Sequence, residues 1–319
     1  YWVDNRSWQR MKKIGRYFQR YCSPMLVFIL VSFFYGIFQR WFLQLIGGSD
    51  EQGAFSLAFR WSQIIIVFTS SIVPICWQEI ASAFGRNDPS RIQELFDKAG
   101  RMFYFLASYF AAFICVQSAF LVQAVAGEEY SGAILPLMLM AFYPIHQALS
   151  HIVSMQLKAT EKTALYRDTG LAGMPVGILL TYLLLAPRDY WIPGLHLNAS
   201  GLVIQILVTQ FFIVNLRLFY ICRSLSISFI RFLVFQTWVP VLLLLTALAV
   251  KAGVCYSGMT GLLVFLPQPF SGFFIQGMIY TLSVSMIVLL VPGCVRTDRR
   301  EIAATMKSAI LFFRKDSHV

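Results

Sequence analysis

Apolar runs long enough to cross a membrane recur along almost the whole of this 319-residue chain. A helix that spans a bilayer needs about 20 apolar residues. Hydrophobic residues make up 58% of the chain and charged residues 13%, whereas about 25% of the residues of a soluble domain are charged. The sequence therefore predicts an all-α membrane protein and leaves no room for a large soluble domain. We expect eight transmembrane helices, near residues 24–46, 53–84, 102–126, 132–157, 170–186, 199–221, 229–250 and 273–295.

Basic residues are distributed unevenly between the connections of these helices. The connections on one side carry only Arg188 and Lys251, whereas those on the other side and the two termini carry most of the 26 Lys and Arg residues. Because Lys and Arg are enriched in cytoplasmic loops, we expect both termini in the cytoplasm, with a basic linker at 1–22 and a basic tail at 296–319. The net charge of +11 then reports orientation and not nucleic-acid binding.

The second apolar run and the residues after it predict more than a simple crossing. Residues 53–84 are too many for one span, so we expect a kink near Pro74, with the last turns leaving the membrane. Asp88, Pro89 and Ser90 form a typical helix start, which predicts an amphipathic helix on the inner surface before the third span. The segment 254–269, punctuated by Gly and Pro, predicts an outer loop or a half-helix.

Two arginines inside the first two spans are candidates for a functional role, because a charge at mid-bilayer costs about 2.5 to 3.5 kcal/mol. Arg40 lies near the end of the first span and Arg60 near the start of the second, so an antiparallel pair places them at one depth. Trp41 and Trp61 follow them, and Gln63 shares the polar stripe of Arg60. These residues predict an electropositive wall for an anionic glycolipid. Alternatively, the arginines reach the headgroups and the tryptophans form an interfacial belt.

The fourth span carries a polar arc of about 140°. Its members are Tyr143, His146, Gln147, Ser150, His151, Ser154 and Lys158. We include His146 and Gln147 among the candidate binding residues. His146 and His151 could carry a coupling proton, but we expect each to be neutral and hydrogen-bonded to another helix, because the sequence places no acidic residue at their depth.

Two further spans carry features with a structural interpretation. Arg217 lies so near the inner end of the sixth span that we expect its side chain to reach the lipid headgroups. Gly170, Gly173 and Gly177 lie on one side of the fifth span, where small residues permit close contact between helices. We therefore predict a packing seam for the glycines.

Several kinds of chemistry have no signature in the chain. It contains no P-loop, HExxH motif or GxSxG motif with partner residues, and its acidic residues outside the inner segments lie in short turns. Five of the six cysteines lie in or beside apolar runs, which indicates neither a disulfide framework nor a thiolate metal site. We expect no catalytic residue, no metal and no cofactor.

Several segments together resemble bacterial polysaccharide and O-antigen flippases of the multidrug/oligosaccharidyl-lipid/polysaccharide exporter superfamily. The segments that carry the resemblance are 53–61 (GAFSLAFRW), 68–74 (FTSSIVP), 77–81 (WQEIA), 135–138 (LPLM), 141–147 (AFYPIHQ), 156–163 (QLKATEKT) and 198–202 (NASGL).

The resemblance implies a fold and a function. Such transporters have two six-helix lobes, often followed by two further helices, so 23–221 is similar to the second lobe and 222–295 to the additional pair. The chain begins at Tyr1 and looks like the C-terminal part of such a protein, with the first lobe missing. The implied activity is translocation of an undecaprenyl-pyrophosphate-linked oligosaccharide across the bacterial inner membrane by alternating access, not enzymatic catalysis.

Partners and alternatives follow from the same interpretation. The expected partners are the lipid-linked oligosaccharide, membrane lipids, the missing lobe and other proteins of polysaccharide assembly, with no nucleic acid. The alternatives are a membrane polysaccharide polymerase or acyltransferase, which would need an essential acidic or His residue in an outer loop, and an ion-coupled drug exporter. The clustered arginines argue against a cationic drug, because like charges repel in a low-dielectric site.

Overall fold

The computed structural model describes residues 5–70, 73–257 and 268–290, and all regular structure within them is helical. Seven helices in this part of the chain are long and apolar enough to cross a membrane. The predicted tail at 296–319 and most of the predicted loop at 254–269 lie outside the described residues. The elements are α1 (Asn5–Ser70), α2 (Val73–Gly85), α3 (Pro89–Ala126), the 3-10 helix η1 (Glu128–Ala133), α4 (Ile134–Met140), α5 (Tyr143–Ala159), α6 (Thr163–Leu185), α7 (Asn198–Ser224), α8 (Phe229–Ser257) and α9 (Gln268–Leu290).

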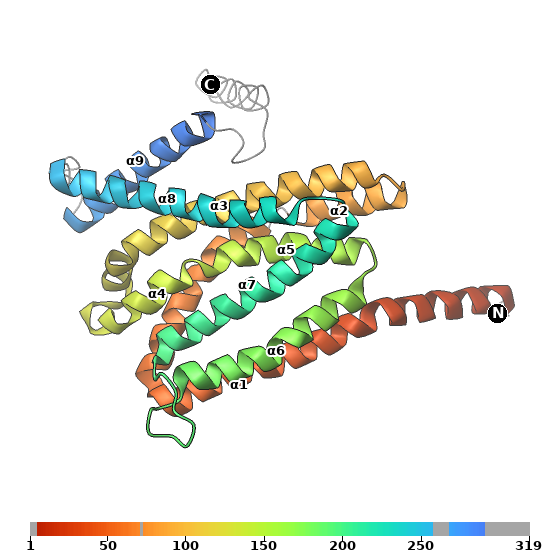
Figure 1. Cartoon of the computed structure of the whole chain (residues 1–319), viewed down its shortest axis with the longest axis horizontal. Helices are drawn as coiled ribbons and strands as arrows, with labels where there is room; N and C mark the ends of the chain where they lie inside the picture. The colour runs from red at the N-terminus through yellow and green to blue at the C-terminus, as the bar shows by residue number, and fades with distance from the viewer. Residues whose placement is uncertain (1–4, 71–72, 258–267, 291–319) are drawn as a thin grey trace, which may run out of the picture.

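The first element, α1, is a helical hairpin. Its apolar part of 60 residues would measure about 90 Å as one straight helix, whereas the hydrocarbon core of a bilayer is about 30 Å thick. Gly48 interrupts it with φ 76° and ψ −168°, a conformation that glycine adopts without steric cost. The guanidinium carbon of Arg40 lies 5.3 Å from the ring centre of Phe59, so the two halves are in contact near the bend, beyond which the second half runs away from the first toward α2 (Figure 1).

The connection from α1 to α3 differs in part from the sequence prediction. The described part of α1 reaches Ser70 and that of α2 starts at Val73, with Pro74 in its first turn; residues 71–72 lie outside the described residues, so the kink near Pro74 stays a prediction. The predicted surface helix is not separate from the third span, because α3 continues for 38 residues from Pro89 to Ala126. No glycine or proline interrupts the register after Pro89 except Gly100, which a buried helix tolerates.

Asp88 starts α3, as the sequence predicts. Its Oδ1 accepts hydrogen bonds from Ser90 Oγ at 2.6 Å and from the Arg91 backbone N at 3.0 Å. These two donors, Ser90 first, lower the pKa of the carboxyl group, because they stabilise its charged form.

We expect Asp88→Ala to lower the thermal stability of the protein and Asp88→Asn to retain most of it, because asparagine also caps helices. Since the folded state lowers the pKa of Asp88, its charged form stabilises the fold above pH of about 4, and this contribution is lost as the pH falls through the folded pKa. Melting temperatures measured between pH 3 and pH 7 check this. A wild-type and an Asp88→Ala protein with the same melting temperature at pH 7 would contradict it.

The fourth predicted span is divided into α4 and α5. Pro144 has no N–H to donate to the carbonyl of Met140. The next residue, Ile145, donates its N–H to the Phe142 carbonyl at 3.2 Å, three residues back, where a regular α-helix has a bond to the fourth residue back. The α-helical ladder is therefore interrupted at residues 141–142, a feature that hydropathy alone does not show.

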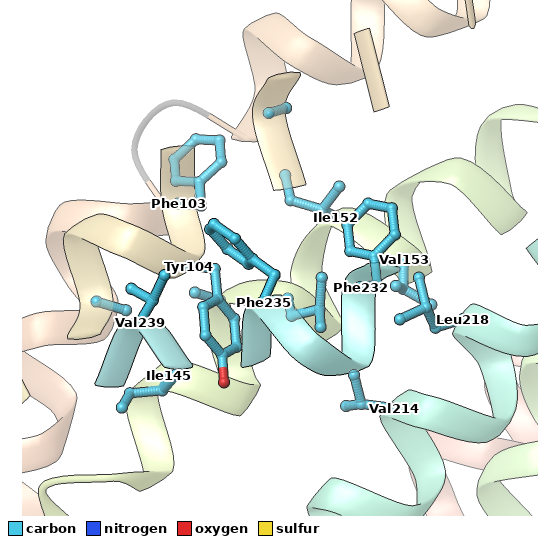
Figure 2. Packing of buried hydrophobic residues seen from close by; sticks show 14 of the residues in the cluster. Phe103, Tyr104, Ile145, Ile152, Val153, Val214, Leu218, Phe232, Phe235 and Val239 are labelled. Carbon is cyan, nitrogen blue, oxygen red and sulfur yellow. The ribbon is translucent and has the colours of Figure 1, made fainter. Parts of the chain in front are cut away.

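The helices form one bundle, in which α5 and α7 lie between the α1–α6 side and the α3–α8–α9 side (Figure 1). The larger core cluster joins α2, α3, α5, α7 and α8. Figure 2 shows its centre, where Tyr104 packs against Phe235 at 5.7 Å between ring centres, and the Tyr104 hydroxyl donates to the Gln236 carbonyl at 2.9 Å. Asn215 and Gln236 exchange amide hydrogen bonds between α7 and α8.

The glycine seam of α6 lies against α1 and α7. A Cβ atom at Gly170 would meet the ring of Phe28. One at Gly173 would meet Ile213, and one at Gly177 would meet the hydroxyl of Tyr35. The seam therefore lets the α6 backbone approach its neighbours closely.

Candidate functional site

The members of the polar arc of α5 other than His146 line two neighbouring cavities. The first has a volume of about 570 Å³ and is lined by α5 together with the end of α1 and the start of α2. The second has a volume of about 370 Å³ and lies between α1, α5, α6 and α7. Gln147, Ser150 and Tyr166 line both. The two cavities therefore adjoin along α5, and we call their polar lining the polar track.

Amide side chains are hydrogen-bonded to one another across the second cavity. Gln205 of α7 donates to the Tyr35 hydroxyl and to Thr209 Oγ1, both at 2.9 Å, and Gln39 of α1 donates to Gln205 Oε1. Hydrogen bonds of this kind hold helices together where lipid supplies no partners. They also present amide and hydroxyl groups to the cavity.

A second network connects α7 to α5. Gln210 Nε2 donates to Gln147 Oε1 at 2.7 Å, and Gln147 Nε2 lies 3.1 Å from His151 Nε2. Both Gln147 and His151 line the first cavity. His151 thus contacts a neutral amide of its own helix, and not the partner on another helix that we expect from the sequence.

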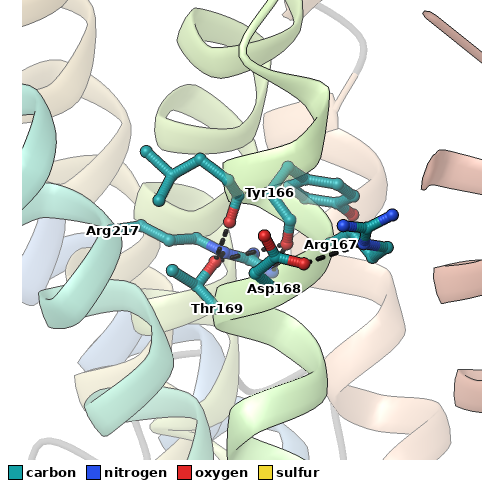
Figure 3. Close-up of polar contacts among 6 residues, drawn as sticks. Tyr166, Arg167, Asp168, Thr169 and Arg217 are labelled. Atoms are coloured by element: carbon teal, nitrogen blue, oxygen red, sulfur yellow. Dashed lines mark hydrogen bonds and ion pairs between the residues drawn. The ribbon is translucent and has the colours of Figure 1, made fainter. Parts of the chain in front are cut away.

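Arg217 is buried beside the second cavity, with 3% of its surface exposed. Figure 3 shows its guanidinium group against α6, where Nε donates to Thr169 Oγ1 at 2.9 Å and Nη2 donates to the Tyr166 carbonyl at 3.0 Å. The ring centre of Tyr166 lies 4.4 Å from the guanidinium carbon of Arg217 and 4.9 Å from Nζ of Lys158. One aromatic ring thus joins two cations.

The positive charge of this cluster is not balanced by an acid. Within the described residues, neither Lys158 nor Arg217 forms an ion pair with a carboxylate, and the neighbouring Asp168 pairs with Arg167 at 2.8 Å (Figure 3). A buried charge is costly unless it is paired, and cation–π contacts supply only part of the compensation. Arg217 is buried and Lys158 is half-buried, and two such cations beside the cavities favour an anionic ligand.

The candidate residues of the first two spans lie apart from these cavities. Arg40 and Arg60 are exposed on the bundle, Trp41 has 57% of its surface exposed, and Gln63 is half-buried. Trp61 packs beside the smaller core cluster. None of the five lines either cavity. They do not form one wall with Gln147 in the described structure.

His146 is also separated from Gln147. Its ring packs between Tyr104 at 6.3 Å and Phe211 at 5.3 Å, on another side of α5 from the polar track. Its Nδ1 is buried and has no hydrogen-bond partner among the described residues. Of the candidate residues, the structure therefore places Gln147 and His151 together.

Our expectation for Arg217 was wrong, because the structure buries its side chain between α6 and α7. The contact of Tyr166 with both Lys158 and Arg217 was also not predicted. One signal was available in the sequence: Arg217 shares a broad helix face with Gln205, Thr209 and Gln210, and a polar face in a membrane span faces protein or water.

Comparisons with family models, with curated proteins and with solved structures find no match for this chain.

Proposed function

We propose that this chain is part of a transporter that translocates a pyrophosphate-linked lipid oligosaccharide across the bacterial inner membrane. The observation that carries the proposal is the pair of cations, Lys158 and Arg217, which both contact the ring of Tyr166 beside the polar track. Because these charges have no carboxylate partner among the described residues, a pyrophosphate is a suitable ligand for them.

The remainder of the track suits the sugar part of such a cargo. Gln147, Gln205 and Gln210 offer amide groups, and Tyr35 and Tyr143 offer aromatic faces and hydroxyl groups along the second cavity. Binding sites for small molecules combine apolar walls with a few convergent polar groups in this way. The lipid tail would remain in the membrane, which the apolar outer surface of the helices contacts.

The proposed topology follows from the hairpin in α1. Its two halves, together with the six other long apolar helices, make eight crossings, with both termini in the cytoplasm. In this proposal residues 23–221 are one six-helix lobe of a two-lobe exporter of the O-antigen flippase type, and 222–295 are an additional pair. The exposed Arg40 and Arg60 then contribute to the wall that faces the other lobe, and the protein is not an enzyme.

The proposal is tested by binding, which this chain can show by itself. We expect the purified protein in lipid nanodiscs to bind a polyprenyl-pyrophosphate disaccharide at least about tenfold more tightly than the same disaccharide on an uncharged polyprenyl chain, since charge-assisted hydrogen bonds are the stronger ones. Fluorescence titration with the two labelled lipids measures this ratio. Equal affinities, or preferential binding of a lipophilic cation, would contradict the proposal.

A further inference from the structure

A cavity of about 500 Å³ lies between the beginning of α1 and the turn that joins α5 to α6. Residues 5–23 of α1 precede its apolar run and extend past the start of α6 (Figure 1). We call this part of the helix the basic extension and the cavity beside it the extension cavity. The walls of this cavity include Tyr17, Arg20 and Tyr21 of α1, Glu161 of the turn, and Thr163 and Ala164 of α6.

Two tyrosines hold the basic extension against the α5–α6 turn. The Tyr17 hydroxyl donates to Oε1 of Glu161, and the Tyr21 hydroxyl donates to the carbonyl of Lys158 at 3.0 Å. Tyr17 and Tyr21 are four residues apart and so lie on one face of the helix. These bonds keep the helix segment that carries Arg20 beside the start of α6.

The start of α6 offers backbone N–H groups that have no acceptor. The N–H groups of Thr163, Ala164 and Leu165 form no hydrogen bond within the described residues, and the side chain of the preceding Lys162 does not cap them. The first N–H groups of a helix need partners from outside the helix. Together with the helix dipole, these groups favour an anion.

The end of α5 in the same turn does not offset this preference, because most of its carbonyls are already bonded. Three of the last four carbonyls of α5 accept backbone hydrogen bonds from the turn, namely those of Gln156, Leu157 and Lys158. The last of these also accepts the bond from the Tyr21 hydroxyl. Carbonyls that already accept hydrogen bonds attract a cation less than free ones, so the free donors of α6 dominate.

The side chain of Thr163 adds a hydroxyl donor to the extension cavity. Thr163 has 3% of its surface exposed and lines the cavity. Thr169 and Thr181 donate to the carbonyl four residues earlier in α6, whereas the hydroxyl of Thr163, the first residue of α6, forms no hydrogen bond within the described part of the chain. It is not one of the fully enclosed oxygens without a partner, so a ligand can reach it from the cavity. Because a buried hydroxyl without a partner is unfavourable, an acceptor bound there would stabilise the fold.

Positive charge prevails around the extension cavity. Residues 5–24 contain six Lys and Arg residues and no acid. The Arg20 side chain is exposed and forms no ion pair with a described carboxylate. Glu161 is the acidic residue of the wall, and its carboxylate accepts the hydrogen bond from Tyr17. A ligand with a phosphate near Arg20 and a hydroxyl near Glu161 matches this distribution.

We propose that the extension cavity binds the phosphodiester group of an anionic membrane phospholipid of the phosphatidylglycerol type. The phosphate would accept hydrogen bonds from the first N–H groups of α6, from the Thr163 hydroxyl and from Arg20. A glycerol hydroxyl would donate to Glu161, whereas the quaternary ammonium of phosphatidylcholine has no hydrogen to donate. The cavity lies where the apolar runs of α1 and α6 begin, which is the level of the lipid headgroups.

The site is independent of the proposed transport function, because the extension cavity shares no residue with the two cavities of the polar track. The experiment compares lipid binding by the purified protein in nanodiscs of phosphatidylcholine with and without added phosphatidylglycerol. We expect phosphatidylglycerol to raise the melting temperature of the wild type and to be retained about tenfold over phosphatidylcholine in native mass spectrometry, the value of one hydrogen bond to a charged group.

Two variants test the residues that contact the phosphate. Arg20→Gln should remove the preference for phosphatidylglycerol. Thr163→Val keeps the shape of the side chain without its hydroxyl and should lower the preference about fivefold, the value of one ordinary hydrogen bond. This variant should fold like the wild type, because the hydroxyl forms no hydrogen bond within the described protein.

The matched control is Arg16→Gln, since Arg16 is exposed one turn earlier on the basic extension and does not line the cavity. This variant should keep the preference of the wild type. Equal losses in Arg16→Gln and Arg20→Gln would indicate a general attraction of a basic helix to anionic lipid and overturn the site. An unchanged preference in Thr163→Val, or equal retention of both lipids by the wild type, would overturn it as well.

Inorganic phosphate added to phosphatidylcholine nanodiscs separates the two sources of the phosphate group. Stabilisation by phosphatidylglycerol and not by inorganic phosphate supports the proposal. Equal stabilisation by inorganic phosphate would overturn the lipid as the ligand of this cavity.

Discussion

Replacing both Lys158 and Arg217 with glutamine is expected to weaken binding of a polyprenyl-pyrophosphate disaccharide by about 100-fold or more. A hydrogen bond to a charged group contributes about 1.5 to 3 kcal/mol, and 1.4 kcal/mol corresponds to about a factor of ten in affinity. Both cations contact the Tyr166 ring, so the double variant removes both positive charges beside the track. Titration of nanodiscs with the fluorescent lipid measures the change.

The control must separate binding from folding, because Arg217 also joins α7 to α6 through Thr169 and the Tyr166 carbonyl. Arg217→Lys keeps the charge but loses the two-pronged hydrogen bonding, so its affinity should lie between the wild type and Arg217→Gln. Arg188→Gln removes a charge from the α6–α7 connection, outside both cavities, and should leave binding unchanged.

The competing view is that Arg217 has only a structural role. It predicts that Lys158→Gln, which removes no hydrogen bond that Arg217 makes, leaves the affinity for the pyrophosphate lipid unchanged. A fall in affinity for Lys158→Gln with an unchanged melting temperature would support the binding role. An unchanged affinity for both single variants would contradict it.

Much of the helical arrangement follows from the sequence because a membrane span has a simple requirement. A run of apolar residues of sufficient length predicts a crossing, and the structure has seven helices of this kind in its described part. The start of α3 at Asp88 was predictable as well, because a cap is a local interaction between neighbouring residues.

Two features of the fold did not follow from the sequence: one depends on contacts between distant segments and the other on local backbone geometry. The charged segment of α3 before the third span packs on the bundle, where Asp97 and Arg101 pair at 2.9 Å and the guanidinium carbon of Arg101 lies 5.0 Å from the ring centre of Phe235 in α8. A charged segment of this kind is otherwise typical of a membrane surface. The break between α4 and α5 depends on local backbone geometry around Pro144, since proline bends some transmembrane helices and interrupts others.

The helix face that carries the candidate site was predictable, but the burial of Arg217 was not. Helical periodicity places Gln147 and His151 on one face of α5, and both line the first cavity. Periodicity does not tell whether an arginine near a helix end reaches water or a neighbouring helix. Arg217 reaches the neighbouring helix α6, because Gly170 leaves the space in which its guanidinium group lies.

The space beside Gly170 belongs to the glycine seam of α6, and filling this seam is expected to destabilise the protein strongly. Changing Gly170, Gly173 and Gly177 together to alanine is expected to lower the free energy of unfolding by about 5 kcal/mol, since overpacking costs about 1 to 3 kcal/mol at each site. Such a loss is comparable with the whole stability of many proteins, about 5 to 15 kcal/mol. The yield of folded protein and its unfolding in mixed micelles measure the effect.

Single variants show whether stability depends on the close approach of the α6 backbone to its neighbours or on the replacement of a glycine as such. Gly177→Ala places a methyl group against the Tyr35 hydroxyl and the Gln205 amide, so it should separate the 2.9 Å hydrogen bond between them and destabilise the protein by about 2 kcal/mol. Gly36→Ala on α1 meets nothing within 4 Å and should be neutral or stabilise the protein by up to about 1 kcal/mol, because alanine favours the helix. If both variants changed stability equally, close packing of α6 against α1 and α7 would not be the reason for the seam.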